Sequence, residues 1–207
     1  MIMQITTLHL GGLATNCYIL PCGDGGAVVV DIGDGAAKLM EKLQELQLSV
    51  KAVLLTHGHY DHVAGVEETR LAYHCPVYIH EADERMLRSG DANLAWQLTD
   101  KPFTPVQSYE LLRDGDSLTI GDLTFRVMHT PGHTPGGVCY FVDDLMFSGD
   151  TLFAGSIGRI DLGGNAQDMR ESLDKLGKLD GDYTIYPGHF DSSTLAWERE
   201  HNPYLRG

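Results

Sequence analysis

The chain has 207 residues, 43% of them hydrophobic, and a formal net charge of -14, which is enough apolar material for one substantial core. The acidic balance argues against nucleic acid and anionic membranes as main partners, because both bind clustered basic side chains. No run approaches the roughly 18 apolar residues that cross a bilayer, and residues 1–10 lack a cationic region followed by an apolar one.

The first half of the chain contains two apolar segments that predict buried β-strands, residues 27–31 and residues 52–55. Between them, residues 36–48 carry leucines at helical spacing with Glu and Lys in between, which is typical of an amphipathic helix. His57 and His59 follow the second strand directly.

The middle of the chain is rich in turn signals. Residues 114–116 and 120–122 predict hairpins next to short strands at residues 125–128 and 138–142. The polar stretch of residues 89–108 predicts a mobile loop or lid. We find no domain linker, and we therefore expect a single domain over residues 1–207.

The second half repeats the order of the first. A strand at residues 145–147 leads to Asp150, Met169 and Leu173 lie at helical spacing, and a strand at residues 183–186 runs into His189. Both halves therefore read strand, aspartate, helix, strand and histidine, with Asp31 as the first aspartate. We expect two sheets related by pseudo-symmetry, with polar side chains converging at the strand ends.

Four side chains of metal-ligand type fall within six residues, in the segment His57-Gly58-His59-Tyr60-Asp61-His62. In an extended segment, residues two apart project the same way, so His57 and His59 are predicted to bind one ion. Asp61 and His62 lie a step further on and are predicted to reach another ion. The alternative, a solvated polar turn, is disfavoured because such a density of ligands at a strand end seldom arises without a metal.

Three further side chains can complete such a site. His133 lies between Pro-Gly turns that hold its backbone stiffly. Asp150 follows a buried strand, where an unpaired charge is costly unless a cation meets it. Its two oxygens suit it to bridge ions about 3.5 to 4 Å apart. His133 or His189 alone would more often be structural, but beside the first cluster both favour a metal site.

Together, these motifs resemble the metallo-β-lactamase-fold hydrolases, and most closely their glyoxalase II-like branch. The resemblance covers the chain from Asn16 to about Leu205 and implies an α/β protein with an αβ/βα four-layer sandwich. The implied ligands of the first metal ion are His57, His59 and His133, those of the second are Asp61, His62 and His189, and Asp150 binds both. The chain is similar to a short form without the C-terminal helical domain that contributes to glutathione binding in the classical enzymes.

The resemblance implies two divalent metal ions per chain, zinc first, with iron or manganese as alternatives. It implies thioester hydrolysis by a hydroxide that bridges the two ions, with Asp61 and Asp150 acting through that metal-bound hydroxide. Asp31 resembles the family's aspartate that orients a ligand or the bridging water, with a helix cap or a buried polar residue as the alternative. We expect a hydroxyacylglutathione hydrolase with a small-molecule thioester substrate such as lactoylglutathione.

Two residues are candidates for substrate binding. Tyr60 lies inside the first motif, with a packing role as the equal alternative. Arg159 could meet a carboxylate of the substrate, with a salt bridge to Asp161 as the alternative. The last motif departs from the family, because Phe190 follows His189 where glycine is frequent.

Other functions remain open. A persulfide dioxygenase, with a single iron held by two histidines and an aspartate, is the closest rival, followed by other small-substrate hydrolases of this fold. A lactamase function is less well supported, because none of the four cysteines takes a ligand position. A nuclease function is disfavoured by the acidic charge. A non-catalytic metal-binding module is a further alternative. We expect a cytoplasmic monomer or small homo-oligomer, with the cysteines buried as small hydrophobes and not bridged.

Overall fold

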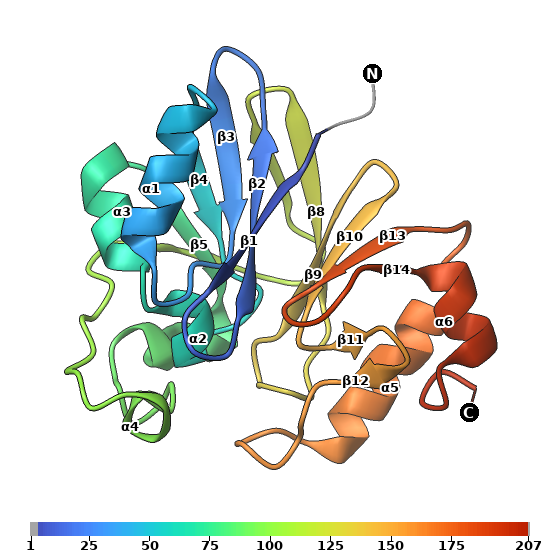
Figure 1. Cartoon of the computed structure of the whole chain (residues 1–207). Helices are drawn as coiled ribbons and strands as arrows, with labels where there is room; N and C mark the ends of the chain where they lie inside the picture. Colours follow the sequence, from blue (N-terminus) through green and yellow to red (C-terminus); the bar gives the residue numbers. More distant parts are fainter. Residues whose placement is uncertain (1–3, 207) are drawn as a thin grey trace.

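The computed structural model describes residues 4–206, in which two six-stranded β-sheets face each other and helices cover both outer faces (Figure 1). Residues 1–3 and 207 of the expected domain, and with them part of the N-terminal segment 1–10, lie outside this range. The first sheet has the strand order β1 (Thr6–Leu10), β2 (Thr15–Pro21), β3 (Gly26–Val30), β4 (Ser49–Leu54), β5 (Val77–His80) and β6 (Glu110–Leu112).

The second sheet has the strand order β14, β13, β10, β9, β8 and β7. In chain order these strands are β7 (Ser117–Ile120), β8 (Leu123–His129), β9 (Val138–Val142), β10 (Leu145–Gly149), β13 (Thr184–Pro187) and β14 (Ser193–Thr194). A separate two-stranded hairpin lies beside it and consists of β11 (Leu152–Phe153) and β12 (Ser156–Ile157).

The helices divide between the two sheets (Figure 1). Helices α1 (Ala36–Glu45) and α3 (Val66–Tyr73) cover the first sheet, and α5 (Ala166–Gly177) and α6 (Leu195–His201) cover the second. The short helices α2 (Tyr60–Val63) and α4 (Ala95–Leu98) and the 3-10 helix η1 (Glu81–Leu87) lie at the lower end of the first sheet. This arrangement confirms the predicted αβ/βα sandwich.

Three apolar clusters separate the four layers, and the alternation of side chains along each strand explains them. In β2, Cys17 and Ile19 belong to the cluster with the α1 leucines, whereas Tyr18 and Leu20 belong to the cluster between the sheets. In β9, Cys139 faces the cluster with α5 and α6. Both faces of these strands are buried, which is why they read as continuous apolar runs in the sequence.

The two predicted halves are confirmed as two parallel crossover units. Strand β3 pairs in parallel with β4 through α1, and β10 pairs in parallel with β13 through α5. Because the carboxyl ends of parallel strands meet at the same edge of a sheet, Asp31 and Asp150 occupy equivalent places at the two strand ends.

Two predictions about local structure are wrong. The turn at residues 114–116 does not form a hairpin, because β6 and β7 on either side of it belong to different sheets and the turn carries the chain between them. The segment after His59 is not extended, because residues 60–63 form helix α2. The turn at residues 120–122 does form the expected hairpin, between β7 and β8, with Gly121 at φ 61°.

The four cysteines are confirmed as buried and free. Over residues 4–206, no helix combines the length and the apolar character required to span a bilayer.

A pair of stacked histidines joins the two sheets. The His80 ring at the end of β5 lies 4.0 Å from the His129 ring at the end of β8, with an angle of 13° between their planes. His80 is buried, and its Nδ1 accepts a hydrogen bond from the backbone N–H of Ala82 at the start of η1. Burial, followed by the neighbouring His129, lowers the pKa of His80 to about 4, although Glu81, Asp114 and Asp116 oppose the shift.

We expect this pair to make the fold less stable in acid. The folded state favours neutral His80, whereas the unfolded chain takes up a proton at the ordinary histidine pKa of about 6.5. The contribution of His80 to the free energy of unfolding is therefore complete above that pH. It decreases by about 2 kcal/mol as the pH falls toward about 4. His80→Asn retains an acceptor for Ala82 without titrating. Urea unfolding at pH 7 and pH 4.5 should show a smaller acid loss in the variant, and equal losses would contradict the prediction.

Candidate metal centre

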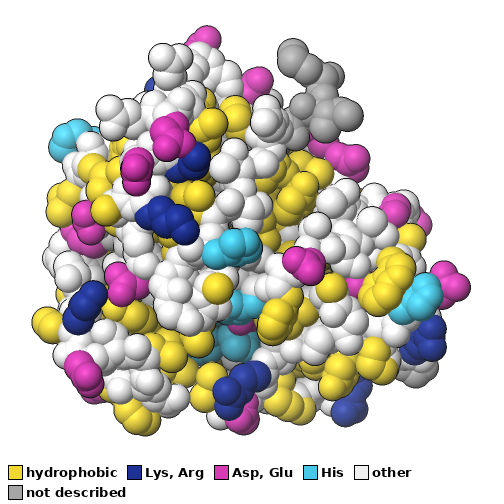
Figure 2. Space-filling model, viewed as in Figure 1, with side chains coloured by type: hydrophobic (Ala, Val, Ile, Leu, Met, Phe, Trp, Pro, Cys, Tyr) yellow, Lys and Arg dark blue, Asp and Glu magenta, His cyan; other side chains and the backbone are white. Residues whose placement is uncertain are grey.

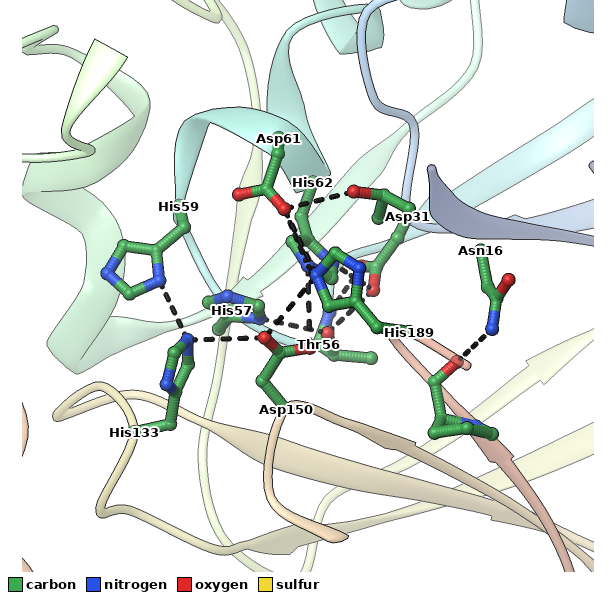
Figure 3. Close-up of polar contacts among 12 residues, drawn as sticks. Asn16, Asp31, Thr56, His57, His59, Asp61, His62, His133, Asp150 and His189 are labelled. Atoms are coloured by element: carbon green, nitrogen blue, oxygen red, sulfur yellow. Dashed lines mark hydrogen bonds and ion pairs between the residues drawn. The ribbon is translucent and has the colours of Figure 1, made fainter. Parts of the chain in front are cut away.

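The seven predicted ligands converge at the edge of the sandwich where the two sheets meet (Figure 3). They come from five segments: the end of β4, helix α2, the β8–β9 loop, the end of β10 and the loop after β13. Three groups have ligand atoms within 4.8 Å of one another: His57, His59 and His133; His57, His62 and Asp150; and Asp61, His62 and His189. The first and third groups are the two ligand sets that the family resemblance implies, apart from Asp150.

Asp150 lies between the two ligand sets. Its Oδ2 is 3.5 Å from His133 Nε2 in the first set and 3.6 Å from His189 Nε2 in the second. Its Oδ1 is 3.5 Å from His62 Nε2. The carboxylate therefore faces both sets, as a bridging ligand must.

Asp31 controls the orientation of two histidines without facing the cavity. It accepts hydrogen bonds from the backbone N–H of Thr56 at 2.8 Å, from Thr56 Oγ1 at 2.7 Å and from His62 Nδ1 at 2.8 Å. Because Thr56 Oγ1 gives its proton to Asp31, it can only accept from His57 Nδ1, which lies 3.2 Å away. In the neutral rings, both Nε2 atoms then carry free lone pairs that point into the cluster.

His133 is oriented in the same way by a different acceptor. Its Nδ1 donates to the carbonyl oxygen of Arg159 at 2.6 Å, which leaves Nε2 as the ligand atom. That Nε2 lies 2.9 Å from Nδ1 of His59, so the two nitrogens face the same point. The backbone of Arg159 therefore takes part in the site, which no motif in the sequence indicated.

Asp83 is a second structural residue that the sequence analysis did not identify. It lies in η1, is fully buried and accepts hydrogen bonds from Gly58 N at 3.0 Å, Thr134 Oγ1 at 2.7 Å and Gly136 N at 2.6 Å. These donors flank the ligand histidines of the first set, so one carboxylate ties together the loops that carry them. No ligand spacing surrounds Asp83 in the sequence, and its partners are 25 to 53 residues away.

The loop that carries His189 is held by Asn16. The Asn16 side chain donates to the carbonyl oxygens of Pro187 at 3.0 Å and Phe190 at 2.9 Å, on either side of the histidine in the sequence. Gly188 is required here, because a Cβ at this position would clash with the carboxylate of Asp150 and the ring of His62. The sequence analysis did not identify this role, and a lone asparagine at the start of the apolar segment of residues 17–20 is the signal that could have indicated it.

The electrostatics of the cluster favour a cation. Burial, reinforced by the other histidines, lowers the pKa of His57 well below its usual value and that of His59 to about 4, so both rings are neutral ligands. Burial acts in the same direction on His62, but the carboxylates of Asp61, Asp150 and Asp31 outweigh it and raise the pKa of His62 to about 10. Although burial opposes it, His62 and His189 hold the pKa of Asp61 below its usual range.

Unpartnered buried atoms show that the residues fit metal ions. Among residues 4–206, four side-chain atoms are buried without a hydrogen-bond partner, and three of them belong to predicted ligands: His57 Nε2, His59 Nε2 and Asp150 Oδ1. An orphaned lone pair and an orphaned carboxylate oxygen are both costly unless a cation meets them. The imidazole and carboxylate donors are those that zinc, iron and manganese accept. The donor set therefore suits two divalent cations.

The metal cluster forms one side of a cavity of about 790 Å³. Figure 2 shows histidines gathered in a hollow near the middle of this face, with hydrophobic side chains around it. Segment 89–108, the predicted lid, contains α4 and contributes Asn93, Leu94, Gln97 and Leu98 to the cavity wall. Its mobility stays a prediction.

The two predicted substrate contacts differ in their positions. Arg159 lines the cavity, and its guanidinium donates to both carboxylate oxygens of Asp161 at 2.9 and 2.7 Å. Tyr60 is buried and lies outside the cavity lining, and its ring packs against Phe103 at 6.2 Å. The geometry thus gives Tyr60 a packing contact, the alternative that the sequence left open.

Comparison with known sequences agrees with this geometry. The family model described as the metallo-beta-lactamase superfamily matches residues 10–189. An uncharacterized protein of Mycobacterium leprae is 43% identical, and the alignment covers 99% of this chain and all of that protein. A probable metallo-hydrolase of Bacillus subtilis is 33% identical over 99% of both chains, and a hydroxyacylglutathione hydrolase of Haemophilus influenzae is 29% identical over 98% of both.

Solved structures share the fold. The BLEG-1 B3 metallo-beta-lactamase superposes with a TM-score of 0.93 and 39% identity, over 99% of this chain and all of that one. The protein TTHA1623, solved in a di-iron-bound form, superposes with a TM-score of 0.86 and 37% identity, over 97% of this chain and all of that one. ETHE1 from Myxococcus xanthus has a TM-score of 0.80 and 26% identity, over 98% and 84% of the two chains.

Proposed function

The chain belongs to the metallo-β-lactamase superfamily, and we propose that it is a metal-dependent hydrolase of thioesters, with a hydroxyacylglutathione as the first substrate to test. The observation that carries this proposal is the position of Asp150 between two sets of histidine and aspartate ligands. The Haemophilus influenzae relative, named as a hydroxyacylglutathione hydrolase, supports the thioester as substrate. A small-molecule partner, a cytoplasmic location and a monomeric or small oligomeric state belong to the same proposal.

The chain's own residues prepare the site. His57, His59 and His133 would hold one cation, Asp61, His62 and His189 the other, and Asp150 both. A pair of divalent cations supplies an activated water at neutral pH and polarises the carbonyl group that is attacked.

Preorganisation is the contribution of the surrounding residues. Asp31 and the Arg159 carbonyl accept hydrogen bonds from Nδ1 of His62 and of His133, which leaves Nε2 of each ring aimed inward as the ligand atom. Thr15 Oγ1 donates to Asp61 Oδ2 at 2.9 Å and holds that carboxylate in place. A thiolate leaves without a proton at neutral pH more easily than an amine, so a thioester does not require a separate general acid.

Metal analysis together with assays tests this function. We expect two ions per chain and S-lactoylglutathione hydrolysis that falls at least about 100-fold on complete metal removal and returns when zinc, iron or manganese is added back. Hydrolysis that survives metal removal would contradict the mechanism.

Metal analysis and assays of the same purified protein also distinguish the rival functions. One iron per chain with oxygen uptake on a persulfide would support the dioxygenase. The likeness to the BLEG-1 lactamase makes a β-lactam the second substrate to assay. If the β-lactam is hydrolysed and no thioester is, the thioesterase proposal is wrong and the hydrolysed bond is the amide of a β-lactam.

A further inference from the structure

Much of the cavity lining beside the metal ligands is apolar. Its large apolar side chains come from five separate segments of the chain and are Leu13, Leu94, Leu98, Phe153, Ile157, Leu162 and Phe190. Leu13, Leu98 and Phe190 remain substantially exposed, Phe190 at 71%. Exposed apolar side chains that gather around a cavity are typical of a binding surface for an apolar group.

Two of these side chains occupy strained backbone positions. Phe190 has φ 66° and Leu94 has φ 65°, in the left-handed region that a glycine adopts without a steric penalty. A glycine would therefore be less strained at either position, and at Phe190 the large apolar side chain is also exposed, so it costs stability through strain and through exposure. Strain that persists beside a reactive site points to a functional side chain.

The geometry places Phe190 beside the reacting centre. Its ring centroid lies 5.4 Å from that of Phe153, with an angle of 79° between the planes, and 6.2 Å from that of His189. Phe153 lies 6.1 Å from His189. Two aromatic rings therefore flank a predicted metal ligand, and the group next to a carbonyl bound at the cluster would contact them.

Hydrogen bonds to the backbone fix the segments that carry Phe190 and Phe153. Asn16 binds the carbonyl oxygen of Phe190 at 2.9 Å. The β11–β12 hairpin, which carries Phe153, is fixed by α6 and the residue after it. Glu198 accepts from Gly155 N at 2.9 Å, and the Asn202 side chain donates to the Phe153 carbonyl oxygen at 3.3 Å. The C-terminal segment thus supports this wall, and preorganised walls lose less entropy on binding.

The charges around the cavity disfavour an anionic acyl group. Among the described residues that line it, Arg159 is the one Lys or Arg side chain, and its guanidinium is already paired with Asp161. Asp191 adds a negative charge to the same lining. A carboxylate on the acyl chain would be repelled by Asp191 and would find no free Lys or Arg side chain in the described part of this lining.

We propose that the substrate's acyl group is an uncharged, apolar chain of medium length, such as hexanoyl, and that Phe190 and Phe153 determine this specificity. The inference rests on the proposed thioester hydrolysis and specifies its acyl side, where we expect a longer apolar chain than the hydroxyacyl group of the first test substrate. The reaction remains hydrolysis: water adds its oxygen to the acyl carbon, the carbon–sulfur bond breaks, and a fatty acid and a thiol are released.

Thioesters of one small neutral thiol, N-acetylcysteamine, test the acyl preference of the metal-loaded enzyme. We expect kcat/KM to rise at least about tenfold from acetyl to hexanoyl, since burial of each methylene contributes up to about fourfold. The succinyl thioester should fall below the acetyl thioester.

Phe190→Gly should reduce the ratio of hexanoyl to acetyl kcat/KM at least about fivefold, while its midpoint of thermal unfolding stays equal to or above that of the wild type. Phe153→Ala should reduce the same ratio. Leu71→Ala is the matched control, because Leu71 is exposed on α3 and lies outside the cavity lining. Its ratio should not change.

A binding measurement separates this inference from the proposed function. S-Methyl and S-hexyl N-acetylcysteamine cannot be hydrolysed, and calorimetry should show tighter binding of the hexyl compound to the wild type, with this difference lost in Phe190→Gly. If no thioester is hydrolysed but the hexyl thioether binds more tightly than the methyl thioether in the wild type and not in Phe190→Gly, the hydrolase proposal fails and the apolar binding site is supported. A flat dependence on chain length in both series, or a ratio that Phe190→Gly leaves unchanged, would overturn the inference.

Discussion

Replacement of Asp150 by alanine is expected to reduce kcat/KM for the thioester on the order of 10³-fold, or about 4 kcal/mol of transition-state stabilisation. The reason is the position of this carboxylate between His133 of the first ligand set and His189 of the second, at 3.5 and 3.6 Å. Without it, the histidines of both sets keep their places but lose the anionic group they share. Elemental analysis should show fewer than two ions per chain.

Two comparisons make this result specific. Asp150→Asn retains the shape but loses the charge and one anionic oxygen, so we expect a loss of activity and metal close to that of alanine. Asp174→Asn makes the same change at an exposed aspartate of α5, which pairs with Lys178 at the end of that helix. It should keep both metal and activity. Asp150→Ala protein that retained two ions and full activity would refute the bridging assignment.

Replacement of Asp83 by alanine is expected to reduce the free energy of unfolding by about 3 kcal/mol, because three buried donors lose their acceptor at once. These donors are Gly58 N, Thr134 Oγ1 and Gly136 N, all within 3.0 Å of the carboxylate. A methyl group in the same space can accept none of their hydrogen bonds. Urea unfolding of the metal-free protein measures this loss.

The position of Asp83 predicts a second effect that general destabilisation would not produce. Its three hydrogen-bond donors all lie in the loops that carry His57, His59 and His133, the ligands of the first set. We expect about a 10- to 100-fold loss of affinity for one of the two ions, with the other retained. Thr134→Val is the matched control, because it removes one of the three hydrogen bonds and should show a smaller effect on both measurements. Equal loss of both ions would contradict a role specific to the first set.

The strands were predictable wherever both faces are buried. Residues 138–142 were predicted as a strand from their apolar run, and β9 occupies the same residues. The turn at residues 114–116 was misread as a hairpin, because turn chemistry is local. It says that the chain reverses or bends, but not whether the next strand pairs with the previous one or joins another sheet.

The candidate ligands were predictable because metal chemistry restricts residue type and spacing together. His57, His59, Asp61 and His62 form a local motif that holds even though the structure places two of them on helix α2 and not on an extended segment. Asp83 had no comparable signal. A lone aspartate carries no information about partners that lie 25 to 53 residues away along the chain.

From the sequence alone, hydrophobic periodicity and ligand spacing, which are properties of neighbouring residues, indicated the two crossover units and the candidate ligands. The resemblance of the motifs to a known family implied the four-layer sandwich and the division of the ligands between two ions. The tertiary structure decided which nitrogen of each histidine faces the cluster, that Asp31 and Asp83 orient it, and that Phe190 stands over the cavity. These features depend on hydrogen bonds and contacts between distant segments, and only the packing of the two sheets brings those segments together.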